Sequence, residues 1–193
     1  MSVASCDICG RPVRRLNLER VCRLDMCSKC TSSNLARKLE ARGWSTDVRA
    51  WEVQAQGVIH FIEVMSTRRG REIPIRASFR PEGITQKAIK LFKREIQVGD
   101  PEFDDAVYIS TDTPELTAGL LESEGVKGAI LELVASGGVL RLADDTLQYS
   151  AQGKAAIRAS QVVLRCSVLL HLVEAFLDTL GGGDSAHEPS SSP

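Results

Sequence analysis

Strand-like patterns of apolar and polar residues dominate the chain after residue 43. β-Branched and aromatic residues concentrate in three segments, at residues 47–55, 57–65 and 73–79. Residues 44–50 form a short bridge into the first segment, and the basic residues 66–72 form a turn between the other two. We therefore predict that the second and third segments pair as a hairpin with a basic tip.

Helical periodicity marks most of the remaining chain. Apolar residues at intervals of three and four predict helices at residues 84–96, 113–124, 126–136 and 154–180. Thr113 followed by Pro114 is typical of a helix start. Asp144 and Asp145 are the predicted turn of a hairpin over residues 139–150. Strands and helices in separate runs predict an α+β fold.

The last of these helices carries a wide apolar arc. Its members are Val162, Cys166, Leu169, Val173, Phe176 and Leu180. An arc of this width is typical of a buried helix or of one with a partner. Helix 154–180 is therefore also the candidate surface for a homo-oligomer. His171 is expected on its polar side near Glu174, and His60 is expected to be a core residue of its strand rather than a ligand.

Composition places the chain among soluble globular proteins, with 43% hydrophobic and 25% charged residues in 193. No apolar run reaches the roughly 18 residues of a membrane span. The N-terminus lacks the basic and apolar regions of a signal peptide, so cytoplasm is the expected location. Residues 181–193 have the composition of a disordered tail, and His187 within it is not expected to be a ligand.

Five of the six cysteines lie in the first thirty residues. Cys6 and Cys9 form one C-x2-C pair, and Cys27 and Cys30 form another after 17 intervening residues. This spacing is typical of zinc sites. Two such pairs close a tetrahedron of thiolates about 2.3 Å from the ion. We predict one structural Zn²⁺ held by these four residues, because catalytic zinc keeps an open position.

Cys22 is the fifth of these thiols, and a tetrahedral site takes four. It alternates with Leu24 and Met26, so the simpler interpretation is a buried thiol on one strand face. The alternative is that Cys22 replaces Cys27 as a ligand.

The order of these features resembles the treble-clef and zinc-ribbon folds. A knuckle around Cys6 and Cys9 precedes a short hairpin, and a helix with Leu35, Ala36 and Leu39 on one face follows Cys30. The resemblance covers about residues 5–43. It implies a treble-clef-like zinc module at residues 1–43. The strand and helix patterns after it predict an α+β protein, with an antiparallel-sheet domain with packed helices at residues 48–180.

Charge divides the chain into two opposite halves. Residues 1–94 contain 19 Lys and Arg against 9 Asp and Glu, whereas residues 95–193 contain 5 against 16. A basic half is typical of nucleic-acid binding, but it also fits a solvated surface or a face that meets the acidic half. The candidate nucleic-acid contacts are Arg11, Arg14, Arg15, Arg37, Lys38, Arg42, Arg68, Arg69 and Arg71.

A second cluster of candidate ligands is acidic. Asp100, Glu102, Asp104 and Asp105 lie within six positions. Such carboxylates can bind a hard cation or perform acid–base chemistry. Ordinary turn chemistry explains them as well, with Phe103 in the core and a strand after it.

Residues 80–109 also resemble a segment of a bacterial family of unknown function with a GDP-x-FD motif ahead of a strand. The resemblance extends over about residues 50–150 and implies a fold but no catalytic residues. Three functions follow. The first is a non-enzymatic zinc-binding protein that serves as a protein-interaction or adaptor module. The second is a nucleic-acid-binding protein that uses residues 1–94. The third is a metal-dependent hydrolase centred on the Asp100–Asp105 loop.

Overall fold

The computed structural model describes residues 3–9, 11–14, 18–21, 24–27, 29–30, 32–53, 58–70, 72–82, 96–155 and 159–181. Within these residues the protein is α+β, with one six-stranded antiparallel sheet and five helices. The strand order is β5-β6-β10-β9-β7-β8. These strands are β5 (Trp44–Val53), β6 (Val58–Arg68), β7 (Ala77–Pro81), β8 (Val107–Thr111), β9 (Gly138–Ala143) and β10 (Thr146–Ala155).

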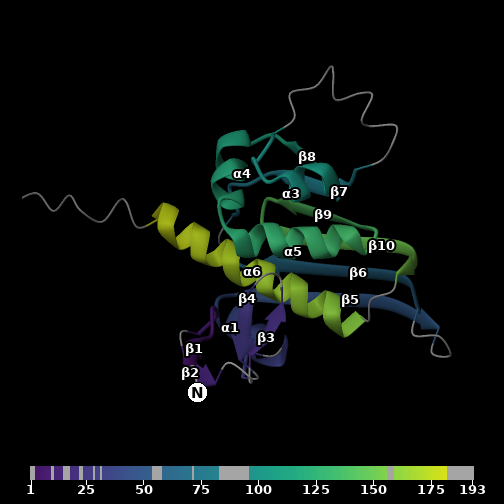
Figure 1. Ribbon diagram of the computed structural model, residues 1–193. Helices are drawn as coiled ribbons and strands as arrows, with labels where there is room; N and C mark the ends of the chain where they lie inside the picture. The colour runs from purple at the N-terminus through teal and green to yellow at the C-terminus, as the bar shows by residue number, and fades with distance from the viewer. Residues whose placement is uncertain are drawn as a thin grey trace, which may run out of the picture.

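The helices cover one face of this sheet (Figure 1). Helix α5 (Glu124–Ala135) packs on β7 and β9, and α6 (Ala159–Gly181) packs on β5 and β6. The two shorter helices, α3 (Pro101–Ala106) and α4 (Pro114–Leu121), lie near the β7–β8 end of the sheet.

The described residues from 3 to 41, called the N-terminal module below, lie at the β5 edge of the sheet (Figure 1). The module contains the hairpin of β1 (Val3–Ser5) with β2 (Pro12–Arg14) and that of β3 (Leu18–Val21) with β4 (Leu24–Cys27). Helix α1 (Ser32–Ala41) follows and packs on both α6 and β5. Leu35 and Leu39, which were predicted to share one face of this helix, are buried, and Gly43 has the positive φ of 90° that favours glycine after a helix.

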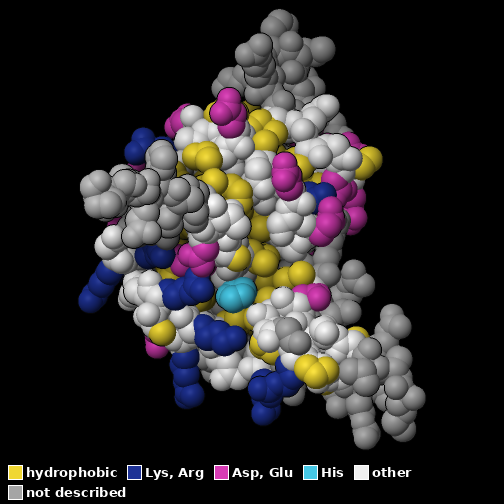
Figure 2. All heavy atoms as spheres, turned by 90° about the vertical axis from the view of Figure 1, so that its left-hand side faces the viewer, with side chains coloured by type: hydrophobic (Ala, Val, Ile, Leu, Met, Phe, Trp, Pro, Cys, Tyr) yellow, Lys and Arg dark blue, Asp and Glu magenta, His cyan; other side chains and the backbone are white. Residues whose placement is uncertain are grey.

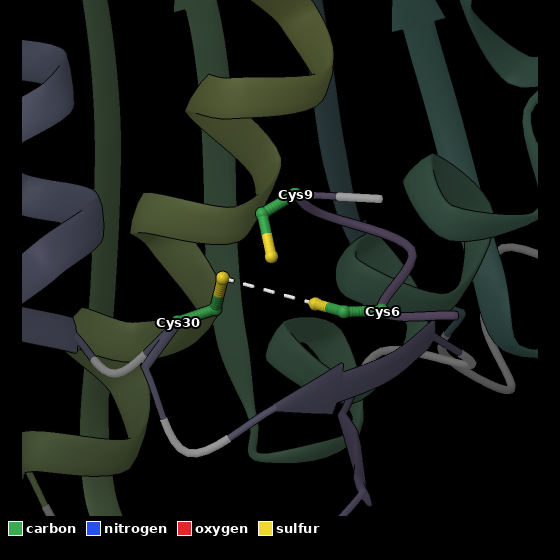
Figure 3. A group of neighbouring side chains, drawn as sticks. All are labelled: Cys6, Cys9 and Cys30. Carbon is green, nitrogen blue, oxygen red and sulfur yellow. Dashed lines mark hydrogen bonds between the residues drawn. The ribbon is translucent and has the colours of Figure 1, made fainter. Parts of the chain in front are cut away.

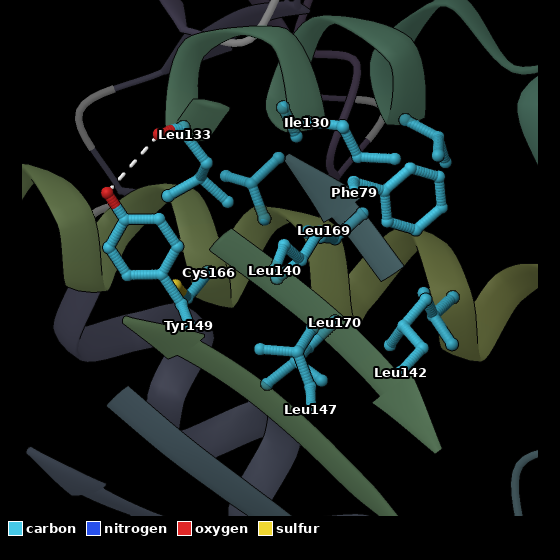
Figure 4. Close-up of a cluster of buried hydrophobic side chains, with 14 of the residues drawn as sticks. Phe79, Ile130, Leu133, Leu140, Leu142, Leu147, Tyr149, Cys166, Leu169 and Leu170 are labelled. Carbon is cyan, nitrogen blue, oxygen red and sulfur yellow. Dashed lines mark hydrogen bonds between the residues drawn. The ribbon is translucent and has the colours of Figure 1, made fainter. Parts of the chain in front are cut away.

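The core lies between the sheet and α5 and α6. Because side chains alternate across a strand, Leu140 and Leu142 of β9 and Leu147 and Tyr149 of β10 all point to the helical face. They meet apolar side chains from α5 and α6 there (Figure 4). The Tyr149 hydroxyl is satisfied within this core, because it donates to the carbonyl of Leu133 at 3.2 Å.

The arc predicted for the last helix is largely confirmed. Val162, Cys166, Leu169 and Val173 are buried and Phe176 is half-buried, whereas Leu180 is 46% exposed. The hairpin of β9 and β10 turns at the predicted Asp144, whose φ is 55°. Among the residues that the structure describes, no helix is both long and apolar enough to cross a membrane.

The hairpin predicted between residues 57–65 and 73–79 is wrong. Strand β6 pairs with β5 and β10, whereas β7 pairs with β8 and β9. Two strands from later in the chain therefore lie between these consecutive strands. The predicted basic turn is also displaced, because residues 66–68 still belong to β6.

Two smaller predictions are corrected as well. The bridge at residues 44–50 is the first part of β5, which pairs with β6 from Trp44 onward. The acidic loop at residues 100–105 is mostly the short helix α3. The helix predicted at residues 84–96 and the tail at 181–193 lie almost wholly outside the described residues, as does Cys22.

Candidate metal centre

Three of the predicted zinc ligands come together in the N-terminal module. The sulfur atoms of Cys6, Cys9 and Cys30 all lie within 4.8 Å of one another and could hold a metal ion. Figure 3 shows their side chains converging from two segments of the chain. Within the described residues this is the one group of His, Cys, Asp or Glu that has such geometry.

The first hairpin positions two of these thiols. Cys6 follows β1 directly, and Cys9 ends the turn over residues 7–9. The backbone amide of Cys6 donates to the carbonyl of Arg11 at 3.0 Å and closes the turn. The backbone therefore forms a tight knuckle between β1 and β2, which turns both thiols to the same side.

The start of α1 positions the third thiol. Cys30 lies two residues before this helix, and the Asn34 side-chain amide donates to the carbonyl of Lys29. This bond connects the first turn of the helix to the ligand segment. Cys30 is brought beside Cys6, with 3.8 Å between their sulfur atoms.

This sulfur–sulfur distance fits a metal–thiolate tetrahedron. Four sulfurs that each lie about 2.3 Å from a central ion are about 3.8 Å apart. The donor set is three thiols, which suits Zn²⁺ and other soft cations better than Mg²⁺ or Ca²⁺.

The fourth predicted ligand, Cys27, ends β4, where its backbone pairs with Leu18. Its side chain lies outside the described part of the structure. The choice between Cys27 and Cys22 therefore stays a prediction.

The burial of the three thiols is unequal. Cys6 and Cys30 are 1% and 4% exposed, whereas Cys9 lies on the surface. The buried pair belongs to one hydrophobic cluster with Ile8 and Met26 that continues into the core of the sheet. A metal at this position would therefore have one apolar side and one side that solvent reaches.

A buried carboxylate joins the module to the rest of the protein. Glu174 of α6 is 1% exposed and accepts a bond from the Trp44 indole at 2.9 Å. The Arg68 guanidinium binds both of its carboxylate oxygens, each at 2.9 Å. Arg42, directly after α1, also reaches Glu174 at 3.3 Å and Asp178 at 2.9 Å. The Glu174 carboxylate thus accepts hydrogen bonds from Arg42 after α1, from Trp44 of β5 and from Arg68 of β6.

Charges at this junction act on neighbouring ionisable groups. The hydrogen bond to Asp178, followed by that to Glu174, raises the pKa of Arg42. Burial lowers the pKa of His171, and the positive charges of Lys38 and Arg42 lower it further. The side chain of His171 is therefore favoured in its neutral form beside α1.

The sequence did not indicate this junction as a site. Two features could have indicated it: Glu174 inside the apolar stretch of the last helix, and Trp44 at the start of β5. Glu174 and Arg68 are 106 positions apart. A single sequence does not relate residues at that separation.

The structure separates the candidate nucleic-acid contacts into different environments. Arg11, Arg37, Lys38 and Arg69 are exposed. Arg68 is 8% exposed and held by Glu174, so the interpretation of Arg68 as a surface contact is wrong. The remaining candidate Arg42 is used by Glu174 and Asp178. The side chains of Arg14, Arg15 and Arg71 lie outside the described residues.

The acidic cluster has structural partners. Asp100 is the N-cap of α3 and accepts from the Phe103 amide at 3.3 Å. Asp104 accepts from the amides of Val98 and Gly99. Lys127 of α5, which is almost buried, lies 3.4 Å from Asp100.

The other two members of this cluster, Glu102 and Asp105, are exposed on α3, and Phe103 fills the core as predicted. The carboxylates of Asp100 and Asp104 therefore hold α3 in place. The side chains of His60 and His187, neither of which was expected to be a ligand, lie outside the described part of the chain.

No family model matches the chain, and neither a curated protein nor a solved structure matches it.

Proposed function

We propose that the chain is a non-enzymatic zinc-binding protein whose N-terminal module serves as a protein-interaction or adaptor module. The observation that carries this proposal is the 3.8 Å distance between the sulfurs of Cys6 and Cys30, with Cys9 beside them. Cys27 completes the proposed set of four thiolates. Four thiolates fill the coordination shell of Zn²⁺ and leave no position for substrate, so the proposed role is structural.

The order of the module's elements supports a treble-clef-like fold. A knuckle between β1 and β2 carries the first ligand pair, and the β3–β4 hairpin follows it. Helix α1 begins directly after the second pair. A zinc ion at the centre of these three parts would replace the large apolar core that about forty residues cannot build.

A role in binding a protein fits where the module lies. One side of α1 packs on α6 and β5, whereas Arg37, Lys38, Glu40 and Ala41 of the same helix are exposed. The metal would therefore hold an exposed helical surface in a fixed position. Thiolate ligation also favours a reducing compartment, and we propose the cytoplasm.

The hydrolase hypothesis receives less support. Asp100 and Asp104 already accept backbone hydrogen bonds, and Asp100 has Lys127 beside it. Carboxylates held in this way have fewer oxygen lone pairs left for a cation or a substrate proton. The nucleic-acid hypothesis has lost Arg68 as a contact and has no new observation in its favour.

Elemental analysis of the full chain, purified without added metal, tests the proposal. We expect one zinc per chain in the native protein and less than half in Cys27→Ala. Cys166→Ala is the matched control, because this thiol lies in the core between sheet and helices and should leave the zinc content unchanged.

Cys22→Ala distinguishes the two possible ligand sets. Retention of zinc in this variant supports Cys27 as the fourth ligand. Loss of zinc in Cys22→Ala together with retention in Cys27→Ala would assign the fourth position to Cys22. A native protein that contains no zinc, with Cys6 and Cys9 or Cys30 joined in a disulfide, would contradict the proposal.

A further inference from the structure

The C-terminal half of α6 is flanked by elements of opposite charge. On one side α1 reaches it through Arg42, which binds Asp178 at 2.9 Å. On the other side lies the part of α4 and α5 from residue 115 to residue 125, called the α4–α5 corner below. A Cβ atom on Gly119 would be 3.5 Å from the Phe176 ring, and one on Gly125 would be 3.1 Å from Leu172. Residues 171–180 of α6 therefore run between α1 and this corner.

The side formed by α1 is basic on balance, because its exposed Arg37 and Lys38 outnumber its exposed Glu40. Arg37 and Lys38 are exposed, and no described residue forms an ion pair with either of them. Lys38 is close enough to His171 of α6 for its charge to act on that imidazole. The positive charge of this side thus lies directly beside the exposed strip of α6.

The side formed by the α4–α5 corner is acidic. Glu115 of α4 and Glu122, which caps the end of this helix, are exposed, and no described cation pairs with them. Glu124 at the start of α5 is 65% exposed although it reaches Lys127. Figure 2 shows the resulting separation on this face, with most Lys and Arg side chains in its lower half and most Asp and Glu side chains in its upper half.

Apolar side chains lie between the two charged sides. Leu172 and Phe176 are half-buried, and Leu180 is 46% exposed, the largest exposure among the described large hydrophobic residues. Figure 2 shows hydrophobic atoms reaching the surface in a band that connects the acidic and basic halves of this face. Apolar surface of this kind between polar borders is typical of a protein–protein contact.

We infer that a second copy of this chain docks on this face, with α6 at the centre of a two-fold symmetric dimer. The two-fold axis lies in the contact plane, perpendicular to the line from the basic α1 side to the acidic α4–α5 corner. Rotation about this axis places the basic side of each copy against the acidic corner of the other. The same rotation brings the apolar strips of α6 together. An interface of this type is self-complementary and closed.

Charge complementarity favours this partner over others. The chain has a net charge of −1, so two copies do not repel each other at long range. A long polyanion that approached the basic side would meet the acidic corner beside it. A second copy matches both charges at once.

Sedimentation velocity of the full chain tests the inference. We expect a dimer at low ionic strength that dissociates as salt is raised, because exposed charges are screened over about 10 Å at 0.1 M salt. The double variant Arg37→Glu and Lys38→Glu should weaken dimerisation by about tenfold or more, and so should Glu115→Lys with Glu122→Lys.

Mixing the two charge-reversed variants is the decisive step. Each variant presents like charges to its own copy, but each is complementary to the other, so a heterodimer should form. Arg80→Glu with Arg141→Glu is the matched control. It lowers the net charge by the same amount as Arg37→Glu with Lys38→Glu, but on the face of the sheet opposite to the helices. The dimer should therefore persist.

Three results would overturn the inference. The first is a native chain that stays monomeric at high concentration and low salt. If removal of residues 182–193 from such a chain then produces a dimer, that segment is the occupant of this face in place of a second copy. The second is a dimer that both charge-reversed variants retain. The third is a mixture of the variants that stays monomeric. Zinc content and circular dichroism of each variant show whether a loss of dimerisation comes from the changed charges or from loss of the proposed metal site.

Discussion

The N-terminal module and the sheet with its helices, called the sheet domain below, share one hydrophobic cluster but differ in how much of it each contributes. The module contributes few large buried side chains, chiefly Leu35, Leu39 and Met26, and its ligand segments meet at three sulfur atoms. The sheet domain packs Phe79, Tyr149 and many aliphatic residues between six strands and two helices. Small modules compensate for a small core with a metal or disulfides, whereas a large core needs neither. The two regions should therefore respond differently to the same treatments.

Metal removal should produce the largest difference between them. Structural zinc supplies an apparent 10–16 kcal/mol or so of folding free energy in small peptides. A strong chelator should therefore abolish amide dispersion for residues 3–30, while amides of β9, β10 and α5 keep theirs. Two-dimensional NMR of labelled protein before and after chelation measures both regions at once. Loss of dispersion throughout the chain would mean that the two regions form one folding unit.

Glu174→Ala should weaken both regions, because its carboxylate joins them. The change leaves Arg68 buried without its partner and the Trp44 indole without an acceptor, which costs about 3–5 kcal/mol for a broken buried pair. Urea unfolding at neutral pH measures this loss. Asp178→Ala removes a half-exposed pair with Arg42 and should cost less than about 1 kcal/mol. Equal losses in the two variants would contradict this assignment.

Gly138→Ala should affect the sheet domain alone. A Cβ atom at this position would overlap the ring and hydroxyl of Tyr149. That ring cannot move away easily, because it is fully buried and its hydroxyl lies 2.6 Å from the Ser136 hydroxyl. We expect a loss of about 1–3 kcal/mol in urea unfolding, with unchanged zinc content.

Gly119→Ala is the control for this substitution. Its Cβ would make only ordinary contact with Phe176, and alanine favours the helix by about 0.5–1 kcal/mol. A Gly138→Ala protein as stable as the native one would mean that the sheet can open at this position.

The smallest effect concerns pH at the junction between the two regions. Burial, with the charges of Lys38 and Arg42, lowers the pKa of His171, while Glu174 opposes this shift. The unfolded chain therefore binds a proton more readily than the folded chain, so stability should fall as pH decreases below about 6.5. His171→Gln should flatten this part of a plot of unfolding free energy against pH. An unchanged slope would assign the pH dependence to other groups.

Local patterns in the sequence predicted what is local in the structure. The C-x2-C spacing identified Cys6 and Cys9, because two thiols three residues apart can meet in one tight turn. The 3.6-residue period identified α1 and most of the buried arc of α6. The hairpin of β9 and β10 followed from the turn residue Asp144. In each case the determining residues lie within one element or one turn.

Long-range pairing was not predictable in the same way. The error at β6 and β7 arose because strands that are neighbours in sequence were expected to pair, whereas β10 lies beside β6. Arg68 was interpreted as a surface cation because its buried partner Glu174 lies on a helix 106 positions later. A single sequence records neither of these pairings, since they depend on how whole elements pack.

The strand order also sets a sequence of events during synthesis. Strand β6 leaves the ribosome long before β10, which must pair with it, and β9 and β10 must both be present before β6 and β7 belong to one sheet. Arg68 has its partner Glu174 only later still, when α6 has been synthesised. The N-terminal module, in contrast, has all its predicted ligands by residue 30. A nascent chain therefore has its candidate metal ligands early but leaves the edge of β6 that pairs with β10 open until residues 146–155 have been made, and non-local pairing of this kind is intrinsically slow.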